Sequence, residues 1–448
     1  MEIGQEDLRH HSLPVQRWWP SPNESPFHWS VATIYLPQRR LCCPPQSLPT
    51  SARSGVTPEG VWVTRSASRL SAGNGPRTNR VSSTGPGDGP AFFDQWLMMF
   101  SLHAVQAALR QFGFDAWLLY DFRGSNLLAR RVLDFPDGTM GSRRWFYCIP
   151  ATGEPHKLVH RIEDGALDHL PGDKTVYLRW QELEQGVAAL LRGQRRVALE
   201  YSPRNGNPYV SKVDAGTVEL VRSCGVEVAS SGDLVQLFEA TWDDEQEQMH
   251  FAAAEVTHAA FNVAWRSIAT GIREGGGISE TAVQDAIMAH FAEHGLTTYH
   301  APIVGRGPHS GLPHYETGQG ADVMIRTGDF VLIDLWAKLD RPRAVYSDLT
   351  RTGFAGTEVP QRYVDIFNIV AAARDAGIAA VRDAFAAGRP LQGWEVDDAV
   401  RKVIVAAGYG EQFRHRTGHN IGQEVHGNGA NLDNLETREE RQLLPRTC

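Results

Sequence analysis

The segment from His314 to His426 constrains this chain more than any other, because it sets charged and metal-ligating side chains into sequence that otherwise looks like core. Asp334 and Asp348 each interrupt a run of apolar residues, and His419 follows in a glycine-rich stretch. Charged groups in such surroundings must be paired or must hold a cation. The segment therefore suggests a metal site.

The two aspartates are expected on an antiparallel hairpin. A turn centred near Arg341 would place Asp334 and Asp348 directly opposite each other on one face of the sheet. Two buried carboxylates at that distance repel, so they need a shared proton or a bound cation. In the structural alternative, both aspartates are solvated at strand ends or pair with Arg341, Arg343 or Arg351. The two aspartates by themselves favour this alternative.

The histidines shift the balance toward a metal. His419 and the two aspartates make a nitrogen and oxygen donor set suited to Mn, Co, Fe or Zn. His314, His415 and His426 add three more imidazoles in the same part of the sequence. A lone histidine would be expected to be a satisfied core residue, whereas four histidines beside two strand-borne aspartates favour a metal site.

Composition excludes several other classes of protein. The chain has 448 residues, enough for two or three domains, with 42% hydrophobic and 21% charged residues, as in soluble globular proteins. A net charge of -8 gives no reason to expect nucleic acid or an anionic membrane as partner, and no apolar run is long enough to span a bilayer. The odd number of scattered cysteines predicts a reducing, cytoplasmic setting without a disulfide framework. They are Cys42, Cys43, Cys148, Cys224 and Cys448.

Residues 1–97 differ from the rest. They are rich in proline, serine, glycine and arginine and sustain no periodic pattern, which predicts disorder. Neither a transit peptide nor a secretory signal fits their charge pattern. Because Met98 and Met99 directly precede the first well-patterned helix, a translation start there is favoured over a functional tail, and residues 1–97 are then a non-native extension.

Periodicity divides the remainder in two. Residues 98–240 alternate apolar strands with helices and predict an α/β domain. Residues 241–448 predict an α+β domain, with strands between two pairs of helices. The predicted strands are 116–120, 145–149, 175–178, 196–200, 226–228, 323–325, 330–336 and 344–352, and the predicted helices are 102–112, 181–192, 212–224, 243–272, 279–294, 361–387 and 396–407.

Four motifs in the second half resemble those of the pita-bread metallopeptidases, the group of Xaa-Pro aminopeptidases, prolidases and methionine aminopeptidases. They are Pro-His-Tyr (313–315), Ile-Asp-Leu-Trp (333–336), Ser-Asp-Leu-Thr-Arg-Thr (347–352) and Gly-His-Asn-Ile-Gly-Gln-Glu-Val-His (418–426). By domain order the resemblance covers residues 101–448, and the α/β domain in front resembles that of aminopeptidase P, creatinase and prolidase. The implied fold is this α/β domain followed by a pita-bread domain.

The resemblance implies roles for particular residues. Asp334 would bind one metal ion, Asp348 would bridge two, and His419 would bind the second. His314 and His426 would contact substrate and stabilise the tetrahedral intermediate, and His415 would line the pocket. The implied reaction is hydrolysis of a peptide bond, of the Xaa-Pro type, by metal-activated water. The implied cofactors are two divalent ions, Mn first and Co or Zn as alternatives.

The family pattern has two further ligands, both glutamates on strands beyond the histidine segment. The chain reaches Cys448 before such strands, so the sequence predicts a pita-bread domain without its last strands and an enzyme with impaired metal binding and turnover. Exposed apolar surface is expected where those strands would pack. The late acids are not expected to replace the two ligands: Glu424 lies within the histidine motif, and Glu436, Glu439 and Glu440 are expected on a solvated face.

Two other functions remain open at this point. One is a non-catalytic protein of the same fold that binds a peptide or a partner. The other is a creatinase-like amidinohydrolase, which uses the fold without metal and which the presence of both aspartates disfavours. The resemblance further implies a peptide substrate, a homodimer, and neither nucleic acid nor membrane as partner.

Overall fold

The computed structural model describes residues 29–30, 100–135 and 141–448, which belong to one unit of the chain. The prediction of disorder for residues 1–97 thus falls almost wholly outside the described residues. Within that range the structure describes β1 (Trp29–Ser30), whose backbone pairs with a strand of the second sheet. The division at residue 240 stays a prediction.

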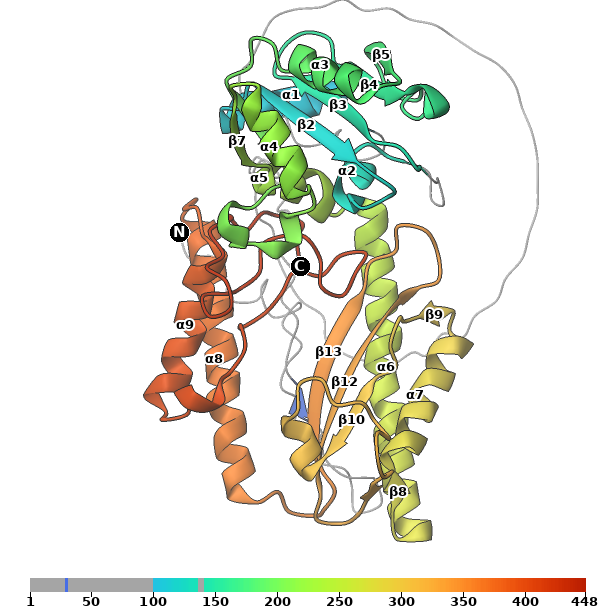
Figure 1. The fold of residues 1–448 in the computed structure, drawn as a ribbon. Helices are drawn as coiled ribbons and strands as arrows, with labels where there is room; N and C mark the ends of the chain where they lie inside the picture. Colours follow the sequence, from blue (N-terminus) through green and yellow to red (C-terminus); the bar gives the residue numbers. More distant parts are fainter. Residues whose placement is uncertain (1–28, 31–99, 136–140) are drawn as a thin grey trace, which may run out of the picture. The chain divides into compact units, whose positions relative to one another are not determined.

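The first sheet lies within residues 116–230 and has six strands in the order β5-β4-β3-β2-β6-β7 (Figure 1). Its centre is β2, in which every residue is buried. Trp117 and Leu119 face one hydrophobic core, and Leu118 and Tyr120 face another, so helices must cover both sides of the sheet. The strands are β2 (Ala116–Asp121), β3 (Trp145–Pro150), β4 (His156–His160), β5 (Asp173–Tyr177), β6 (Arg196–Leu199) and β7 (Glu227–Ser230).

Local signals bound the first helix beside this sheet. Ser101 caps α1, and Gly113 ends it in the left-handed region at φ 69°. The sequence analysis predicted α1, α3 and α4 and missed β4 and the short helices α2 and α5. The helices are α1 (Leu102–Phe112), α2 (Leu127–Val132), α3 (Trp180–Leu190), α4 (Ala215–Ser223) and α5 (Gly232–Val235).

Two long helices open the second half. In α6 (Asp244–Gly275) the Asp243 side chain accepts a hydrogen bond from the Gln246 amide, and the Gln246 side chain accepts one in return, which is a complete capping box. The helix α7 (Glu280–Glu293) begins at Ser279, whose hydroxyl accepts from the backbone of Ala282. Both helices were predicted within a few residues of these bounds.

The second sheet carries the predicted hairpin, β12 (Phe330–Leu339) and β13 (Ser347–Phe354), with β10 (Ile303–Arg306) beside β12. Alternate residues of β12 face opposite sides. Ile333 and Leu335 lie in the core that α6 and α7 cover, so Asp334 must face the other side. Two short pairings complete this region: β8 (Ile278–Ser279) with β11 (Met324–Ile325), and β9 (Leu296–Thr297) with β12.

The predicted register of the hairpin is wrong by two residues. Asp334 pairs with Thr350, and Asp348 pairs with Trp336, so the two aspartates are diagonal neighbours and not direct partners. The turn is centred one residue later than predicted, and such a shift moves every pairing by two residues. Because side chains alternate with a period of two, both aspartates still lie on the same face.

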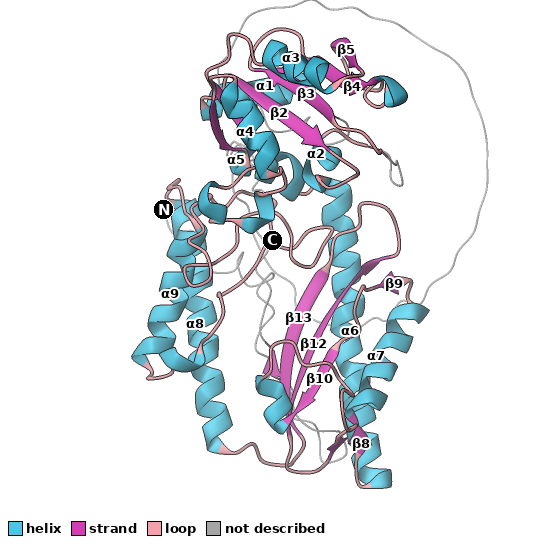
Figure 2. Cartoon of the chain, in the orientation of Figure 1, coloured by secondary structure: helices cyan, strands magenta, loops and turns pink. Residues whose placement is uncertain are grey.

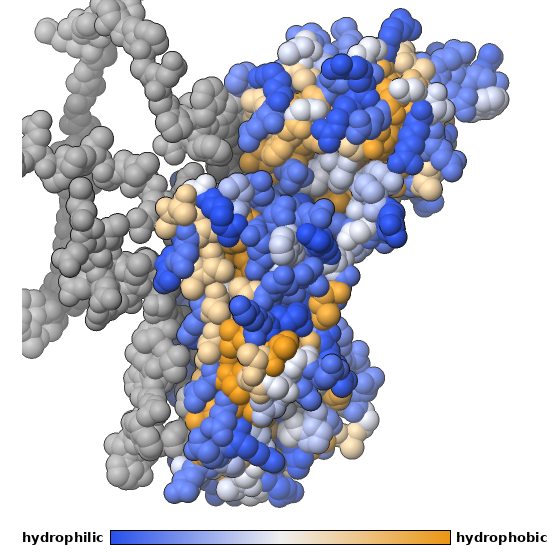
Figure 3. Space-filling model, turned by 90° about the vertical axis from the view of Figure 1, so that its left-hand side faces the viewer, coloured by the Kyte–Doolittle hydropathy of each residue, from blue (hydrophilic) through white to orange (hydrophobic). Residues whose placement is uncertain are grey.

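The last two helices, α8 (Gln361–Ala386) and α9 (Gly393–Ala406), pack against each other and lie on the side of the sheet opposite α6 and α7 (Figures 1 and 2). Exposed apolar side chains mark α8, among them Ile366, Val370 and Phe385. Figure 3 views the molecule from this side and shows apolar surface gathered there.

Among the described residues, no helix is long and apolar enough to cross a membrane. The cysteines in the same ranges, Cys148, Cys224 and Cys448, are free thiols, as predicted for a chain without a disulfide framework.

Candidate metal centre

The hairpin holds its two aspartates on the face turned away from α6 and α7. The hydroxyl of Thr350, the direct cross-strand partner of Asp334, donates a hydrogen bond to Asp334 Oδ1 at 2.5 Å. This bond fixes one carboxylate oxygen of Asp334. The other oxygen remains available to a further donor or to a cation.

The electrostatics of the pair follow from burial and like charge. Burial and, next, the neighbouring charge of Asp348 together raise the pKa of Asp334 to about 7, although the Thr350 hydrogen bond and the His419 charge lower it. The two carboxylates therefore resist being ionised together at neutral pH. A proton or a cation must compensate, as the sequence analysis inferred.

The histidine segment brings His419 to this pair. His419 Nε2 lies 3.4 Å from Asp348 Oδ2, and its Nδ1 lies 3.2 Å from the backbone oxygen of Asn420. If Nδ1 carries the proton and donates to that carbonyl, the lone pair of Nε2 points toward Asp348. Asp334, Asp348 and His419 thus assemble as a nitrogen and oxygen donor set.

One of the predicted helper histidines, His426, lies beside His419. The rings of His419 and His426 are 4.4 Å apart at 87°, edge to face. Burial and, next, the charges of His419, Arg416 and, more weakly, His314 together lower the pKa of His426 to about 4, although the charge of Asp348 raises it. His314 itself is exposed in a turn. The structure thus groups His419 and His426, with His314 within electrostatic reach of His426.

His415 is placed differently. Its ring is exposed, lies 5.5 Å from that of Phe413, and its Nδ1 is 2.7 Å from the backbone oxygen of Arg416. These contacts are with residues next to it in the chain, so the structure gives its predicted role in the pocket no support from geometry.

The loop that carries the histidines is fixed by Asn420. Its side-chain oxygen accepts from the Gly429 amide, and its side-chain nitrogen donates to the Cys448 carbonyl, both at 2.8 Å. A Cβ at Gly427 would meet Asn420 Oδ1 at 2.3 Å, and one at Gly429 would meet Asn420 at 2.7 Å. The glycines of this segment therefore let the backbone wrap closely around one amide side chain.

The structural alternative for the aspartates is not what the structure shows. Arg341 and Arg343 pair with Glu245 and Asp243 at the start of α6. Arg351 stacks 4.4 Å above Phe261 and approaches His258, and burial lowers its pKa to about 10. The three arginines that were expected to neutralise the aspartates are engaged elsewhere.

One expectation about the late acids is wrong. Glu439 is buried at 2% exposure, accepts from the backbone of Asn431 at 3.2 Å and pairs with Arg441. The charged composition of residues 431–442 concealed this buried ion pair. Glu436 and Glu440 are exposed as predicted, and Glu424 accepts two hydrogen bonds from Arg131 of α2.

Several aromatic residues beside the aspartates were missed. Tyr299 has a raised pKa because of burial and the charges of Asp348 and Asp334, which places its phenol in their field. Its ring lies 6.2 Å from that of Trp336, which also stacks with His300 at 6.0 Å. Nothing in the local pattern around residues 299–300 distinguishes them from an ordinary loop.

The donors fit a divalent ion by chemistry. Two like-charged carboxylates with one imidazole are suited to Mn, Co or Zn, and the raised pKa of Asp334 shows a charge that a cation would relieve. No choice of one ligand atom each from Asp334, Asp348 and His419 places all three atoms within 4.8 Å of one another. In the described part of the chain, a different group of residues meets this distance.

Comparison with known proteins finds a family match in the second half of the chain. A model of metallopeptidase family M24 matches residues 248–448. The uncharacterized peptidase YqhT of Bacillus subtilis is 32% identical over 45% of this chain and 51% of its own length. A Xaa-Pro dipeptidase of Pyrococcus horikoshii is 35% identical over 28% of this chain and 32% of its own length. The chain thus spans about half, or less, of these curated relatives.

The fold has a counterpart among solved structures. The crystal structure of the dipeptidase PepE from Mycobacterium ulcerans aligns with a TM-score of 0.56 and 24% identity, over 77% of this chain and 84% of that one. This alignment shows that the two chains share a fold. The part of the chain that matches the M24 family model, residues 248–448, contains the four motifs that carried the resemblance.

Proposed function

We propose that this chain hydrolyses peptide bonds, of the Xaa-Pro type, with divalent metal held by Asp334, Asp348 and His419. The observation that carries the proposal is the aspartate pair on one face of the hairpin with His419 Nε2 3.4 Å from Asp348. The relatives named Xaa-Pro dipeptidase support the choice of substrate.

The metal, when bound, would lower the pKa of a water molecule and polarise the scissile carbonyl. Asp334, Asp348 and His419 would hold the metal, Asp334 through the carboxylate oxygen that does not accept the Thr350 hydrogen bond. Two ions belong to the proposal because the family's pattern implies them. Mn is the proposed metal, with Co or Zn as alternatives.

The neighbouring histidines would contact the substrate. The lowered pKa of His426 keeps its ring neutral at neutral pH, so one ring nitrogen can donate a hydrogen bond while the other accepts. His314, exposed and within electrostatic reach of His426, would bind the far side of the peptide. A pocket-lining role for His415, a homodimer and a cytoplasmic location belong to the proposal as the family's pattern implies them.

The test is hydrolysis of an Xaa-Pro dipeptide by chelator-treated protein to which Mn is returned. An Ala-Ala dipeptide serves as substrate control. Asp334→Asn is the test variant, and Asp340→Asn, an exposed aspartate in the hairpin turn, is its matched control. We expect Mn-dependent cleavage of the proline peptide that Asp334→Asn loses and Asp340→Asn keeps.

Two other results would replace the proposal. Peptide binding without hydrolysis at any metal concentration would identify a non-catalytic binding protein. Cleavage of creatine by metal-free protein would identify an amidinohydrolase.

A further inference from the structure

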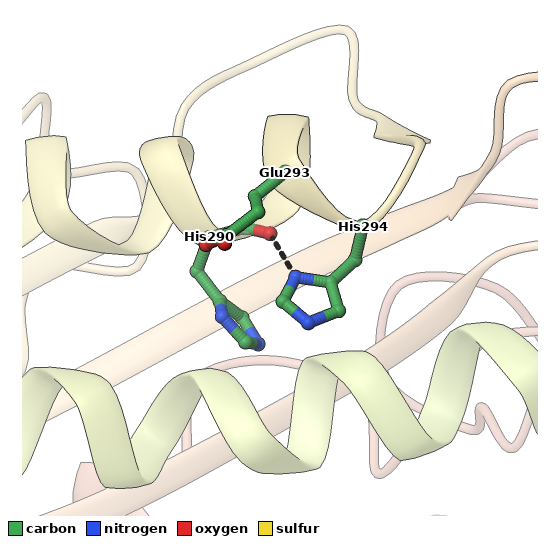
Figure 4. Close-up of side chains that lie close together, drawn as sticks. All are labelled: His290, Glu293 and His294. Carbon is green, nitrogen blue, oxygen red and sulfur yellow. Dashed lines mark hydrogen bonds between the residues drawn. The ribbon is translucent and has the colours of Figure 1, made fainter.

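The end of helix α7 carries a second group of metal-ligating side chains, which the proposed function does not use. His290, Glu293 and His294 lie on one face of the helix, because residues three and four apart in a helix are neighbours. Figure 4 shows the two imidazole rings side by side with the glutamate above them.

The distances of this group are those of a ligand set. One ligand atom from each residue can be chosen so that all three lie within 4.8 Å of one another. The ring centroids of His290 and His294 are 4.1 Å apart at 46°. Among the residues that the structure describes, this is the group of three that meets that distance.

Hydrogen bonding prepares His294 as a ligand. Its Nδ1 lies 2.8 Å from the backbone oxygen of His290, so this nitrogen donates its proton to a carbonyl (Figure 4). The neutral imidazole then carries its lone pair on Nε2. A carbonyl that accepts from one ring nitrogen while the other binds metal is the usual support of a histidine ligand.

His290 presents a nitrogen that lacks a partner. Its Nε2 is buried and has no hydrogen-bond partner among the described residues. A buried polar atom without a partner carries a desolvation cost, which a bound ion would remove.

The place in the fold favours a cation. The group lies at the carboxyl end of α7, where unpaired carbonyl groups carry partial negative charge. Glu293 adds a full negative charge to two neutral imidazoles. Phe291, between the ligands in sequence, is 1% exposed in the core beneath α7, so the helix end that would hold the ion is anchored.

We propose that His290, Glu293 and His294 bind a divalent transition-metal ion of the Zn²⁺, Ni²⁺ or Cu²⁺ kind, separate from the ion or ions at the hairpin. Two imidazole nitrogens and one carboxylate oxygen favour these ions over Mg²⁺ and Ca²⁺, which prefer all-oxygen sites. The ion would close the last turn of α7 and stabilise it. Peptidase activity does not enter this inference.

The experiment measures Zn²⁺ binding by the full chain after chelation, by equilibrium dialysis, in an Asp348→Asn background that weakens the hairpin site. His294→Ala removes an exposed ligand and should not prevent folding. Asp285→Asn, an exposed carboxylate on the same helix, is the control. We expect one equivalent of Zn²⁺ in the control and an affinity weaker by about tenfold or more in His294→Ala.

A second measurement, the thermal shift on addition of Zn²⁺, tests whether metal binding by these side chains stabilises the fold. Because ligand binding stabilises the folded state, saturating Zn²⁺ should raise the melting temperature of the control by a few degrees, roughly. Saturating Zn²⁺ should leave the melting temperatures of His294→Ala and His290→Gln unchanged. The electron paramagnetic resonance spectrum of Cu²⁺ bound to the control should show hyperfine coupling to two imidazole nitrogens. Equal Zn²⁺ affinity and equal thermal shifts in all variants would overturn the proposal, whatever the outcome of the peptidase assay.

Discussion

The hairpin site and the α7 group contain similar residues but are built in opposite ways. Asp334, Asp348 and His419 come from two strands and a distant loop. His290 and His294 are one helical turn apart. The first group exists only when the tertiary structure has formed, whereas the second is set by helix geometry.

Burial differs in the same direction. Asp334 is largely withdrawn from solvent, and the charge of Asp348 adds to the cost of ionising it. Glu293 and His294 are exposed, so the charges of the α7 group are solvated without an ion. A metal at the hairpin therefore relieves a cost built into the fold, and a metal at α7 adds a modest stabilisation. Each prediction below tests a part of this contrast.

The largest effect is expected on catalysis. Asp348→Asn should reduce Xaa-Pro hydrolysis by roughly 1,000-fold, because the lost metal contributes several kcal/mol to the transition state. His294→Ala should leave the rate within about twofold of the starting protein, since the α7 group lies outside the hairpin site. Rates are compared at saturating Mn with the metal content of each protein measured. A large loss of activity in His294→Ala would mean that the two sites are not independent.

The next effect concerns the support that the histidine loop receives from the first sheet region. Arg131 binds both Glu239, which is buried at 4% side-chain exposure, and Glu424. Arg131→Met leaves Glu239 as an uncompensated buried charge and should lower the free energy of unfolding by about 3 kcal/mol. Glu424→Gln should cost less than about 1 kcal/mol, because the Glu424 side chain is 42% exposed.

Urea denaturation measures both variants. If they are equally destabilised, the pair with Glu424 is the stronger contact and the account of Glu239 is wrong. Neither variant should change Zn²⁺ binding at α7, because the contacts of that group are local to its helix.

How far the sequence predicted these two groups depends on what holds each of them. The apolar runs around Asp334 and Asp348 predicted the hairpin and the common face, because a period of two is visible in the sequence. The register was wrong by two residues, since it depends on the conformation of the turn at 340–346, which composition does not determine. The motifs predicted that His419 and His426 lie near the aspartates, and the two rings do lie together there. The side-chain contacts of His415 are with its own neighbours in the chain.

Other features could not have been found from local patterns. Glu439 was expected to be solvated because it lies in a stretch of charged residues that includes its partner Arg441. The burial of this ion pair depends on the tertiary structure. Tyr299 meets the aspartates from a loop without periodicity. The α7 histidines are different, because their spacing was visible in the sequence but was not singled out as a ligand pattern.

A smaller effect is expected in the histidine loop itself. In Gly427→Ala the new methyl group would meet Asn420 Oδ1 at 2.3 Å and the Gly422 amide nitrogen at 3.0 Å, and Asn420 is held by two further hydrogen bonds. We expect a loss of about 2 kcal/mol in the free energy of unfolding. Gly422→Ala is the matched control, because its nearest contact would be at 3.9 Å. Equal stabilities of the two variants would show that the loop is looser than the contacts indicate.

The smallest effect is a dependence of stability on pH. His250 of α6 is 5% exposed, and its Nδ1 donates to the Tyr346 carbonyl at 2.8 Å, which ties α6 to the end of the hairpin turn. Burial lowers the pKa of His250, so the unfolded chain binds a proton more readily than the folded one. Stability is then complete above pH 6.5 and falls as the pH drops through 6.5 toward the lower folded pKa, by at most about 1.4 kcal/mol per pH unit.

Urea denaturation of metal-free protein at pH 7.5 and 5.5 should show a smaller loss in His250→Asn than in the unmodified chain. His290→Gln should reduce the loss less, because His290 is only partly buried and its proton costs less to bind. A larger change for His290→Gln than for His250→Asn would reverse the contrast, since it would make the end of α7, and not the hairpin region, the part of the fold most sensitive to charge.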